Sequence, residues 1–374
     1  MQFSVAIYLY EPSDGGLDRV AILLANELLK RGVKVELWMG HIEGPLASLI
    51  DPQLTVRRIP TPRCNRRLAM IFQFPWFAGM VRLHKPDIVY SAGIQSNRLV
   101  ALAALGTRSR AIGRISNPIV KPRRSRFSAW LRTLNFRTIA RMSAMTIVMG
   151  EADRRTLAAK GPLAGKRVTF LPRPTVTPVF EQARTLRRSR VEGEPWRLLM
   201  VGRLVRQKGQ VMALAALAQM TDVKWSLKIA GKGPLLETLQ DECQRLGIAE
   251  RVEFLGFVSD PEQLALLMAD CDLLLQPSEW EGFGGVVAEA LACGANVVAT
   301  DSTPNIHPLL AAAGQHPPTA ISDATAFRHA ILWALDHPAP IEQIVQAVTP
   351  YRVDQAFDAH LDTFRDLLSD GGNA

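Results

Sequence analysis

Two glutamates and a cluster of glycines stand close together between residues 278 and 294. The segment reads SEWEGFGGVVAEALACG, with Glu281 and Glu289 in an E-x7-E spacing. It follows a strand-like run and opens a helix-like one. Glycines at such a junction let backbone N–H groups approach a ligand, and a helix amino terminus favours negative charge. Two carboxylates placed in this way suit hydrogen bonds to the hydroxyls of one ligand. Taken alone, Glu289 is better explained as a solvated residue on an amphipathic helix.

Three further glycine turns follow strand-like runs in the same half of the chain. They read VGRLVRQKG at 201–209, AGKGP at 230–234 and LGFV at 255–258. In a parallel sheet such turns meet at one edge. Arg203 and Lys208 beside a glycine turn suit a diphosphate, because arginine binds an anion in bidentate fashion and lysine acts as a point charge. Each segment alone is a weak signal, since both residues also fit ordinary surface charges.

The elements that would position these loops alternate between strands and helices. The first half predicts strands at 2–10, 33–39, 87–91, 111–115 and 146–149, and helices at 19–31 and 97–106. The second half predicts strands at 197–201, 225–230, 252–255, 273–276 and 296–299, and helices at 211–220, 235–246, 261–269 and 286–293. Strands spaced by helices form parallel units. We therefore expect an α/β protein with two doubly wound parallel sheets that face each other across a cleft.

A segment rich in proline and arginine separates the two halves. The alternation lapses between residues 171 and 196, where the composition suits an exposed connection. We expect a first domain at 1–172, a connection at 173–195 and a second domain at 196–350. A C-terminal helix at about 351–370 is expected to pack back on the first domain.

Taken together, the four segments of the second half resemble glycosyltransferase family 4, whose members are retaining sugar-nucleotide transferases of the GT-B fold. The resemblance rests on the three glycine turns, on the E-x7-E block and on the CGANVVATD that ends it, in that order. Their order and spacing cover most of the second domain. The DGGLDRV at 14–20 resembles the family's glycine loop more loosely. The resemblance implies two Rossmann-like domains, the first on the acceptor side and the second holding the donor.

The resemblance also implies roles for individual residues. Arg203 and Lys208 would neutralise the donor diphosphate, and Glu281 would contact the donor sugar. Glu289 would hold the ribose. The other positions expected to bind the donor are Gly15, Gly16, Gly202, Gly231, Val258, Gly282, Phe283, Gly284 and Gly285.

One position departs from the family pattern. Many relatives carry a histidine after the strand that here reads DIVY, whereas this chain continues with Ser91, Ala92 and Gly93. No residue of this chain is therefore an obvious replacement for the histidine that contacts the donor sugar. We place acceptor-side groups at Asp14, Arg114 and Asn117. A turn capped by Asn117 explains the segment RISNP at 114–118 about as well.

Metal and cofactor motifs give little support for a metalloenzyme. Asp270, Cys271 and Asp272 spell a D-x-D, but the motif falls between a helix end and a buried-looking strand. The seven histidines show no H-x-x-H spacing, and the four cysteines form no C-x-x-C pair. We expect a metal-independent reaction and no cofactor besides the nucleotide-sugar substrate.

The net charge of +9 hides a division between the halves. Residues 1–185 carry 29 Lys and Arg against 11 Asp and Glu, whereas residues 186–374 carry 15 against 24. In the basic half, arginines interleave with aromatic residues around Trp76 and Trp130, which suits short helices on an anionic bilayer. An ordinary core-facing stripe is close to equally good for each helix. No recognition fold for nucleic acid accompanies the charge.

The expected function is transfer of a sugar from a nucleotide diphosphate sugar, with a UDP-sugar as the expected donor. The acceptor would be a lipid-linked or saccharide intermediate of envelope polysaccharide or glycolipid synthesis. Without a spanning segment or a basic run at the amino terminus, we expect a cytoplasmic protein, peripheral on the inner membrane. A sugar-nucleotide epimerase and a non-catalytic nucleotide- or glycan-binding protein remain as alternatives. A dehydrogenase is weaker, because no G-x-G-x-x-G follows the first strand.

Overall fold

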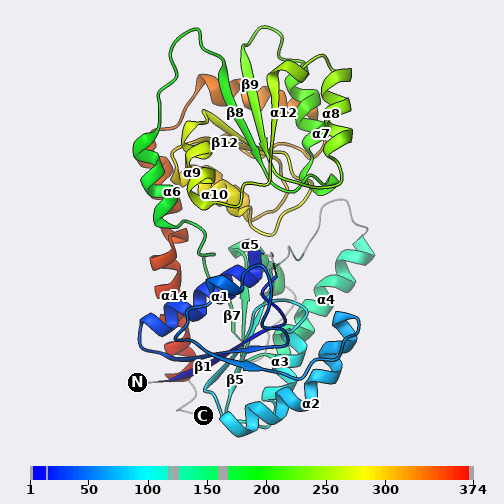
Figure 1. The fold of residues 1–374 in the computed structure, drawn as a ribbon, viewed down its shortest axis with the longest axis vertical. Helices are drawn as coiled ribbons and strands as arrows, with labels where there is room; N and C mark the ends of the chain where they lie inside the picture. The colour runs from blue at the N-terminus through cyan, green and yellow to red at the C-terminus, as the bar shows by residue number, and fades with distance from the viewer. Residues whose placement is uncertain (1–2, 14–15, 117–118, 120–125, 159–166, 370–374) are drawn as a thin grey trace. The chain divides into compact units, whose positions relative to one another are not determined.

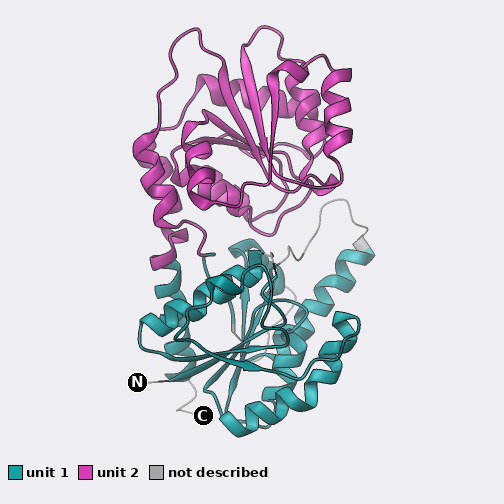
Figure 2. Cartoon of the chain, in the orientation of Figure 1, with its two compact units in different colours: residues 1–120, 124–173, 356–374 teal, residues 121–123, 174–355 magenta. Residues whose placement is uncertain are grey.

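The computed structural model describes residues 3–13, 16–116, 119, 126–158 and 167–369. The chain divides into two compact units (Figure 2). Unit 1 contains the described residues up to 173 and those from 356 onward, and unit 2 contains residues 174–355. Each unit is built on its own parallel sheet, with helices as the connections (Figure 1).

Unit 1 holds a seven-stranded sheet in the order β3-β2-β1-β4-β5-β6-β7. Its strands are β1 (Ser4–Leu9), β2 (Lys34–Met39), β3 (Thr55–Arg58), β4 (Ile88–Ser91), β5 (Arg110–Arg114), β6 (Met145–Val148) and β7 (Arg167–Phe170). Its helices are α1 (Gly16–Lys30), α2 (Arg66–His84), α3 (Asn97–Ala104), α4 (Arg126–Met142) and α5 (Glu151–Ala158), with a 3-10 turn, η1 (Ala47–Leu49). The central strands are buried on both faces, as a parallel sheet between helices requires.

The last helix of the chain, α14 (Val353–Ser369), belongs to unit 1 from residue 356 onward. Its Phe364 lies with its ring centroid 6.0 Å from that of Tyr90 on β4. Its Asp358 forms an ion pair of 3.0 Å with Arg31 at the end of α1. The C-terminal helix is therefore part of the core and surface of unit 1.

Unit 2 holds a five-stranded sheet in the order β10-β9-β8-β11-β12. Its strands are β8 (Trp196–Val201), β9 (Trp225–Ala230), β10 (Val252–Gly256), β11 (Leu273–Gln276) and β12 (Asn296–Ala299). Its helices are α6 (Pro178–Ala183), α7 (Gln210–Ala218), α8 (Leu236–Arg245), α9 (Pro261–Asp270), α10 (Gly285–Ala292), α11 (Ile306–Ala312), α12 (Ala324–Asp336) and α13 (Ile341–Val348). Short 3-10 turns are η2 (Arg184–Leu186), η3 (Arg206–Lys208), η4 (Ala249–Arg251) and η5 (Thr349–Tyr351).

Two differences from the sequence expectation have local causes. The segment expected as an exposed connection contains α6, which begins at Pro178 and buries Phe180 and Ala183. Proline suits the first helical position because its missing N–H would have no partner there. The basic and aromatic segments of the first half form α2 and α4, of 19 and 17 residues, which are longer than the short helices expected.

Candidate active site

Four loops of unit 2 leave the same edge of its sheet. All strand pairs in this sheet are parallel, so the segments after β8, β9, β10 and β11 share the carboxyl edge. These segments are the three glycine turns and the glutamate-containing loop of the sequence analysis. The fold therefore brings together motifs that are spread over about 90 residues of chain.

Gly231 allows the first two of these loops to touch backbone to backbone. A Cβ atom at Gly231 would lie 1.9 Å from the carbonyl oxygen of Gly202, so no other residue fits without moving the loop. The Gly202 N–H donates to the carbonyl of Ala230 at 2.9 Å, and the Gly231 N–H donates to the carbonyl of Gly256 at 2.7 Å. The turns after β8, β9 and β10 are thereby linked in one layer.

Lys208 and Glu281 form an ion pair at this edge. The Lys208 Nζ lies 2.6 Å from Glu281 Oε1, and the two side chains are only 16% and 12% exposed. The same oxygen accepts hydrogen bonds from Gln276 Nε2 at 3.0 Å and from Ser278 Oγ at 2.8 Å. Glu281 is therefore held by three donors, in a position where its charge and that of Lys208 are close but opposite.

Gln207 fixes the spacing between the two loops that carry this pair. Its carbonyl accepts a 2.7 Å hydrogen bond from the Glu279 N–H, and its Nε2 donates to the carbonyl of Trp280 at 2.9 Å. The η3 turn and the loop after β11 therefore run together just before Lys208 and Glu281. A cation and a carboxylate from distant parts of the chain are positioned by backbone contacts.

The glycine loop that follows Glu281 ends at the amino terminus of α10. Gly284 precedes the helix in the left-handed conformation, with φ of 85°, which favours glycine. The buried Phe283 anchors the loop through its ring, whose centroid is 4.7 Å from that of Tyr351. Among the described residues, the structure gives no acceptor for the backbone N–H groups of Phe283 and Gly284. Such groups at a helix start suit a negatively charged ligand.

The remaining predicted donor positions of unit 2 lie at the same edge or next to it. Arg203 is exposed in the loop after β8, and its carbonyl accepts from Gln210 Nε2 at 3.0 Å. Val258 is half-buried two residues after β10. Glu289 is half-buried in α10, in the helix that starts beside Glu281. The ring of Phe257 is exposed, with Lys232 Nζ 4.7 Å from its centroid.

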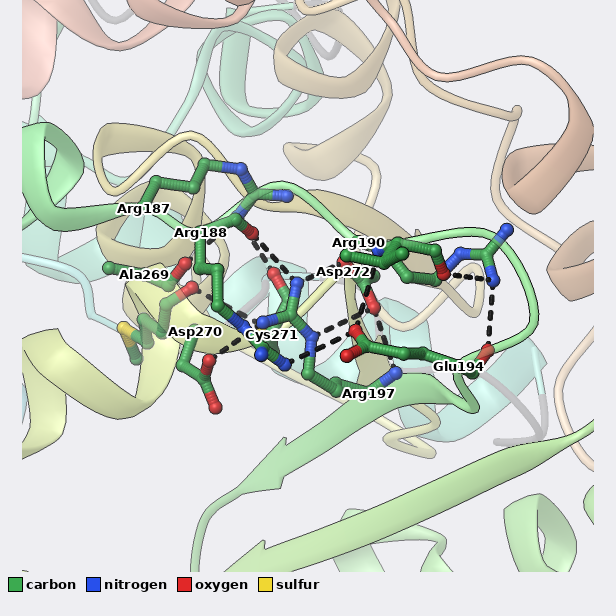
Figure 3. A network of polar contacts seen from close by, with 11 residues as sticks. Arg187, Arg188, Arg190, Glu194, Arg197, Ala269, Asp270, Cys271 and Asp272 are labelled. Atoms are coloured by element: carbon green, nitrogen blue, oxygen red, sulfur yellow. Dashed lines mark hydrogen bonds and ion pairs between the residues drawn. The ribbon is translucent and has the colours of Figure 1, made fainter.

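Arg197 binds both carboxylates of the D-x-D motif, those of Asp270 and Asp272 (Figure 3). Arg197 donates to Asp272 Oδ1 and to Asp270 Oδ1, at 2.7 Å in each case. These hydrogen bonds, with Asp272 first, hold the pKa of the Arg197 guanidinium above its usual value. Arg197 stands near the start of β8 and Asp272 directly before β11, at the amino edge of the sheet. The D-x-D is thus on the opposite edge from Lys208 and Glu281.

Two family models together match most of the chain. The model described as "Glycosyl transferases group 1" matches residues 182–349, and that described as "Glycosyl transferase 4-like domain" matches residues 15–174. The chain is a member of the GT-B glycosyltransferases of the family 4 type. The two matched regions correspond closely to the two parallel-sheet units, which confirms the predicted fold class.

Individual proteins similar to this GT-B glycosyltransferase differ in their named substrates. The 2-deoxystreptamine glucosyltransferase of Streptomyces kanamyceticus is 26% identical over 76% of this chain and 70% of its own length. A Campylobacter jejuni protein named as N-acetylgalactosamine-N,N'-diacetylbacillosaminyl-diphospho-undecaprenol 4-alpha-N-acetylgalactosaminyltransferase is 38% identical over 28% of this chain and 27% of its own length. The solved structure of Anabaena HepE in complex with UDP-glucose aligns with a TM-score of 0.73 at 19% identity, covering 98% of this chain and 100% of that chain.

In unit 1 of the glycosyltransferase, Arg114 is part of the interior. Its side chain is 2% exposed, and its Nη1 donates to the Tyr90 hydroxyl at 3.0 Å. Burial lowers the pKa of His360 to about 3, and the charge of Arg114 adds to this lowering. This burial gives no support to the expectation that the Arg114 side chain faces an acceptor.

In this glycosyltransferase, serine side chains form hydrogen bonds within the segment where many relatives carry a histidine. Ser91 Oγ donates to the carbonyl of Gly93 at 2.9 Å and lies 2.8 Å from Ser96 Oγ. Gly16 begins α1, and its carbonyl accepts from Arg173 Nη2 at 3.0 Å. The predictions for Asp14, Gly15 and Asn117 lie outside the described residues.

Sequence reasoning missed the residues that hold Glu281 in place. Gln276 and Ser278 are both buried and both donate to its carboxylate. One signal was available, because Gln276 is the only polar residue of the strand LLLQ and stands at its carboxyl end. Ligands of open α/β sheets bind outside the carboxyl ends of the strands, so a polar side chain at that end is a candidate site residue.

Proposed function

We propose that this protein transfers a sugar from a nucleotide diphosphate sugar, with UDP as the nucleotide, and that the anomeric configuration is retained. The observation that carries the proposal is the Lys208–Glu281 pair, which lies beside glycine turns at the carboxyl edge of the unit 2 sheet. The HepE structure, which by its title holds UDP-glucose, shares the fold and supports UDP as the first nucleotide to test.

In this proposal the unit 2 loops stabilise the leaving group. Bond cleavage places charge on the nucleoside diphosphate, and Lys208, Arg203 and the N–H groups at the start of α10 offer positive charge and donors for it. Lys208 keeps its ion pair with Glu281 until the donor arrives and then shares its charge with the diphosphate. These groups act on the leaving group directly, so we propose that the reaction proceeds without a divalent metal ion.

Glu281 acts in this proposal by orienting the donor. Its Oε1 already accepts three hydrogen bonds, which hold the carboxylate in one place and reduce its strength as a nucleophile. Retention then follows if a phosphate oxygen of the donor accepts the proton of the acceptor hydroxyl while the bond between the anomeric carbon and the diphosphate breaks. The acceptor oxygen bonds to the anomeric carbon, and the nucleoside diphosphate leaves with the proton.

We propose a lipid-linked acceptor of envelope polysaccharide or glycolipid synthesis, reached by docking of unit 1 on an anionic membrane. Among the described residues no helix is both long and apolar enough to cross a bilayer. However, α2 and α4 carry exposed large apolar side chains as well as arginines. The exposed apolar residues are Leu68, Ile71, Phe72, Trp76, Phe127, Trp130, Leu131 and Leu134. Such surfaces mark interaction sites. The name of the Campylobacter relative, which includes a diphospho-undecaprenol, supports a lipid-linked acceptor.

The donor experiment uses the purified protein with a panel of UDP-, GDP- and ADP-sugars and detects released nucleotide by mass spectrometry. We expect release of UDP from one UDP-sugar, and a roughly hundredfold loss in Lys208→Ala. Lys224→Ala is the matched control, because Lys224 is exposed and directly precedes the start of β9, at the amino edge of the sheet. An epimerised sugar nucleotide without release of UDP would favour an epimerase instead.

The membrane experiment is flotation with vesicles that contain phosphatidylglycerol. We expect the protein to float with these vesicles, to stay behind with purely zwitterionic ones, and to detach as salt rises, because the Debye length is about 8 Å at physiological salt. Trp76→Ser and Trp130→Ser should weaken flotation, whereas Leu236→Ser, at an exposed apolar position of unit 2, should not. Wild-type protein that ignores anionic vesicles at low salt would contradict the membrane proposal. Replacing Arg123, Arg124 and Arg126 by Glu should release the protein from anionic vesicles. Arg123 and Arg124 lie outside the described residues, and Arg126 is the first residue of α4.

A further inference from the structure

A groove with an apolar lining runs between three helices of unit 1. Its volume is about 600 Å³. Helix α3 lies next to both α2 and α4 (Figure 1). Each of the three helices contributes residues to the walls of the groove. The apolar lining includes Met70, Ile71, Phe74, Leu99, Leu102 and Ile139. A groove of this size is within the range that holds small organic ligands.

Two arginines stand at one end of this groove. Arg67 lies in the first turn of α2 and Arg98 in the first turn of α3, and both are exposed. Arg98 donates to Asn135 Oδ1, a third polar residue of the lining. Among the described residues, no aspartate or glutamate lines the groove, and neither arginine has an ion pair. The groove is therefore positive at one end and uncharged elsewhere.

The positive end lies at the carboxyl edge of the unit 1 sheet. Helix α2 follows β3 and α3 follows β4, so the first turns of both helices are at that edge. The loop after β4 also supplies Ile94 and Gln95 to the groove. Ligands of open α/β sheets bind at this edge. An anionic group bound there would place an attached chain between the helices.

The groove is continuous with the exposed apolar surface of α2 and α4. Ile71 both lines the groove and is 66% exposed, and Leu134 is exposed next to the groove residue Asn135. Toward the amino end of α4, the rings of Phe127 and Trp130 stack with centroids 6.0 Å apart. Exposed apolar side chains of both α2 and α4 therefore lie beside the groove, as a surface that meets a bilayer requires.

We propose that this groove binds the hydrocarbon chain of the acceptor, a long-chain alkyl or prenyl phosphate, with its phosphate at Arg67 and Arg98. The proposal rests on the proposed function and adds the class of the acceptor's lipid and its place in the fold. Charge complementarity selects an anionic head, and the length of apolar wall beyond the arginines selects a single long chain. A membrane phospholipid that stays in its bilayer is the competing occupant, which the test below separates.

The test is calorimetric titration of the full-length protein with octyl, decyl and dodecyl phosphate, each below its micelle concentration. At about 0.8 kcal/mol per buried methylene, two added methylenes should tighten binding by roughly 15-fold while the chain still lies in the groove. Arg98→Ala should weaken binding of dodecyl phosphate at least tenfold, since a charged hydrogen bond is lost. Dodecyl maltoside, with the same chain and a neutral head, should bind far more weakly.

Leu102→Glu places a carboxylate in the groove at a position that is 42% exposed, so folding should survive. It should abolish binding of dodecyl phosphate. Leu83→Glu is the control, because Leu83 is 75% exposed on α2 and lies outside the lining. Equal affinity across chain lengths, equal affinity for the neutral head, or binding only to anionic vesicles would overturn the proposal. Titration with UDP tests the donor site separately from the groove. Leu102→Glu should leave UDP affinity unchanged. A wild-type protein that binds dodecyl phosphate but not UDP would contradict the donor site alone.

Discussion

Lys208→Ala is expected to reduce both stability and turnover, for two different reasons. At 2.6 Å and an effective dielectric constant of about 20, the attraction between Lys208 and Glu281 is about 6 kcal/mol before the cost of desolvation. Breaking a buried pair typically costs 3 to 5 kcal/mol. Here both side chains keep some exposure, and Gln276 and Ser278 still donate to the carboxylate. We therefore expect a loss of about 2 kcal/mol in the free energy of unfolding.

A second substitution separates the two effects. Glu281→Gln in the Lys208→Ala background removes the uncompensated charge, so at least about 1 kcal/mol of the free energy of unfolding should return. Turnover should not return, because the cation that faces the leaving group is still missing, and its loss is expected to lower turnover roughly a hundredfold.

The assay combines urea unfolding, followed by tryptophan fluorescence, with the rate of UDP release for the wild type, both single variants and the double variant. Lys224→Ala controls for the loss of an exposed lysine in the same unit. Turnover in the double variant that equals turnover in Glu281→Gln alone would refute the reasoning, because Lys208 would then act only by holding Glu281. Wild-type turnover in Lys208→Ala would refute its role at the diphosphate outright.

The remaining predictions address charge, metal, the two carboxylates and pH. Arg203→Ala should lower turnover roughly a hundredfold with little change in stability, because the side chain is exposed; unchanged turnover would exclude it from the site. Activity should persist in excess EDTA, and a loss restored by manganese or magnesium would show a metal requirement. Glu281→Gln should depress sugar transfer more than it lowers UDP affinity. Glu289→Ala should instead weaken the binding free energy of UDP by about 1.5 to 3 kcal/mol, as measured by calorimetric titration. Equal losses of UDP affinity in both variants would contradict the division of roles. His360 is buried with its pKa lowered to about 3, so below the ordinary value of 6.5 the unfolded chain takes up a proton that the folded protein does not. Stability should therefore be greatest above about pH 6.5 and fall by up to about 1.4 kcal/mol per pH unit toward pH 3, and His360→Leu should flatten this dependence in acid unfolding curves.

Much of the fold could be predicted because most strands are short apolar runs bounded by glycine or proline. The strands from β8 to β12 all coincide with predicted segments to within a residue or so. β3 was missed because its sequence, TVRR, is mostly exposed and charged at the edge of its sheet. α2 was expected only as a short helix around Trp76, because Pro75 lies inside it. An exposed edge strand and a helix with an internal proline both lack the periodic pattern that sequence reasoning uses.

The candidate site was predictable as a set of loops and less so as a set of contacts. Parallel topology places the glycine turns at one edge, which local sequence is enough to suggest. Lys208 and Glu281 are 73 residues apart, so their ion pair depends on the packing of η3 against the loop after β11. Likewise, nothing local in the D-x-D shows that Arg197 binds both carboxylates. Contacts of this kind follow from register and loop packing, which the sequence pattern leaves open.

The C-terminal helix has a consequence for how the protein is made. Unit 1 needs α14, whose Phe364 packs near Tyr90 and whose Asp358 pairs with Arg31, whereas the 174–355 segment of unit 2 comes before that helix is complete (Figure 2). Domains usually fold in the order of synthesis, with the N-terminal one first. Here the unit that is translated first is complete only after α14 has been synthesised, and the Tyr90 side of its sheet is uncovered until then. A fragment ending at residue 173 should consequently aggregate when expressed alone, and co-expression with a peptide containing α14 should rescue it.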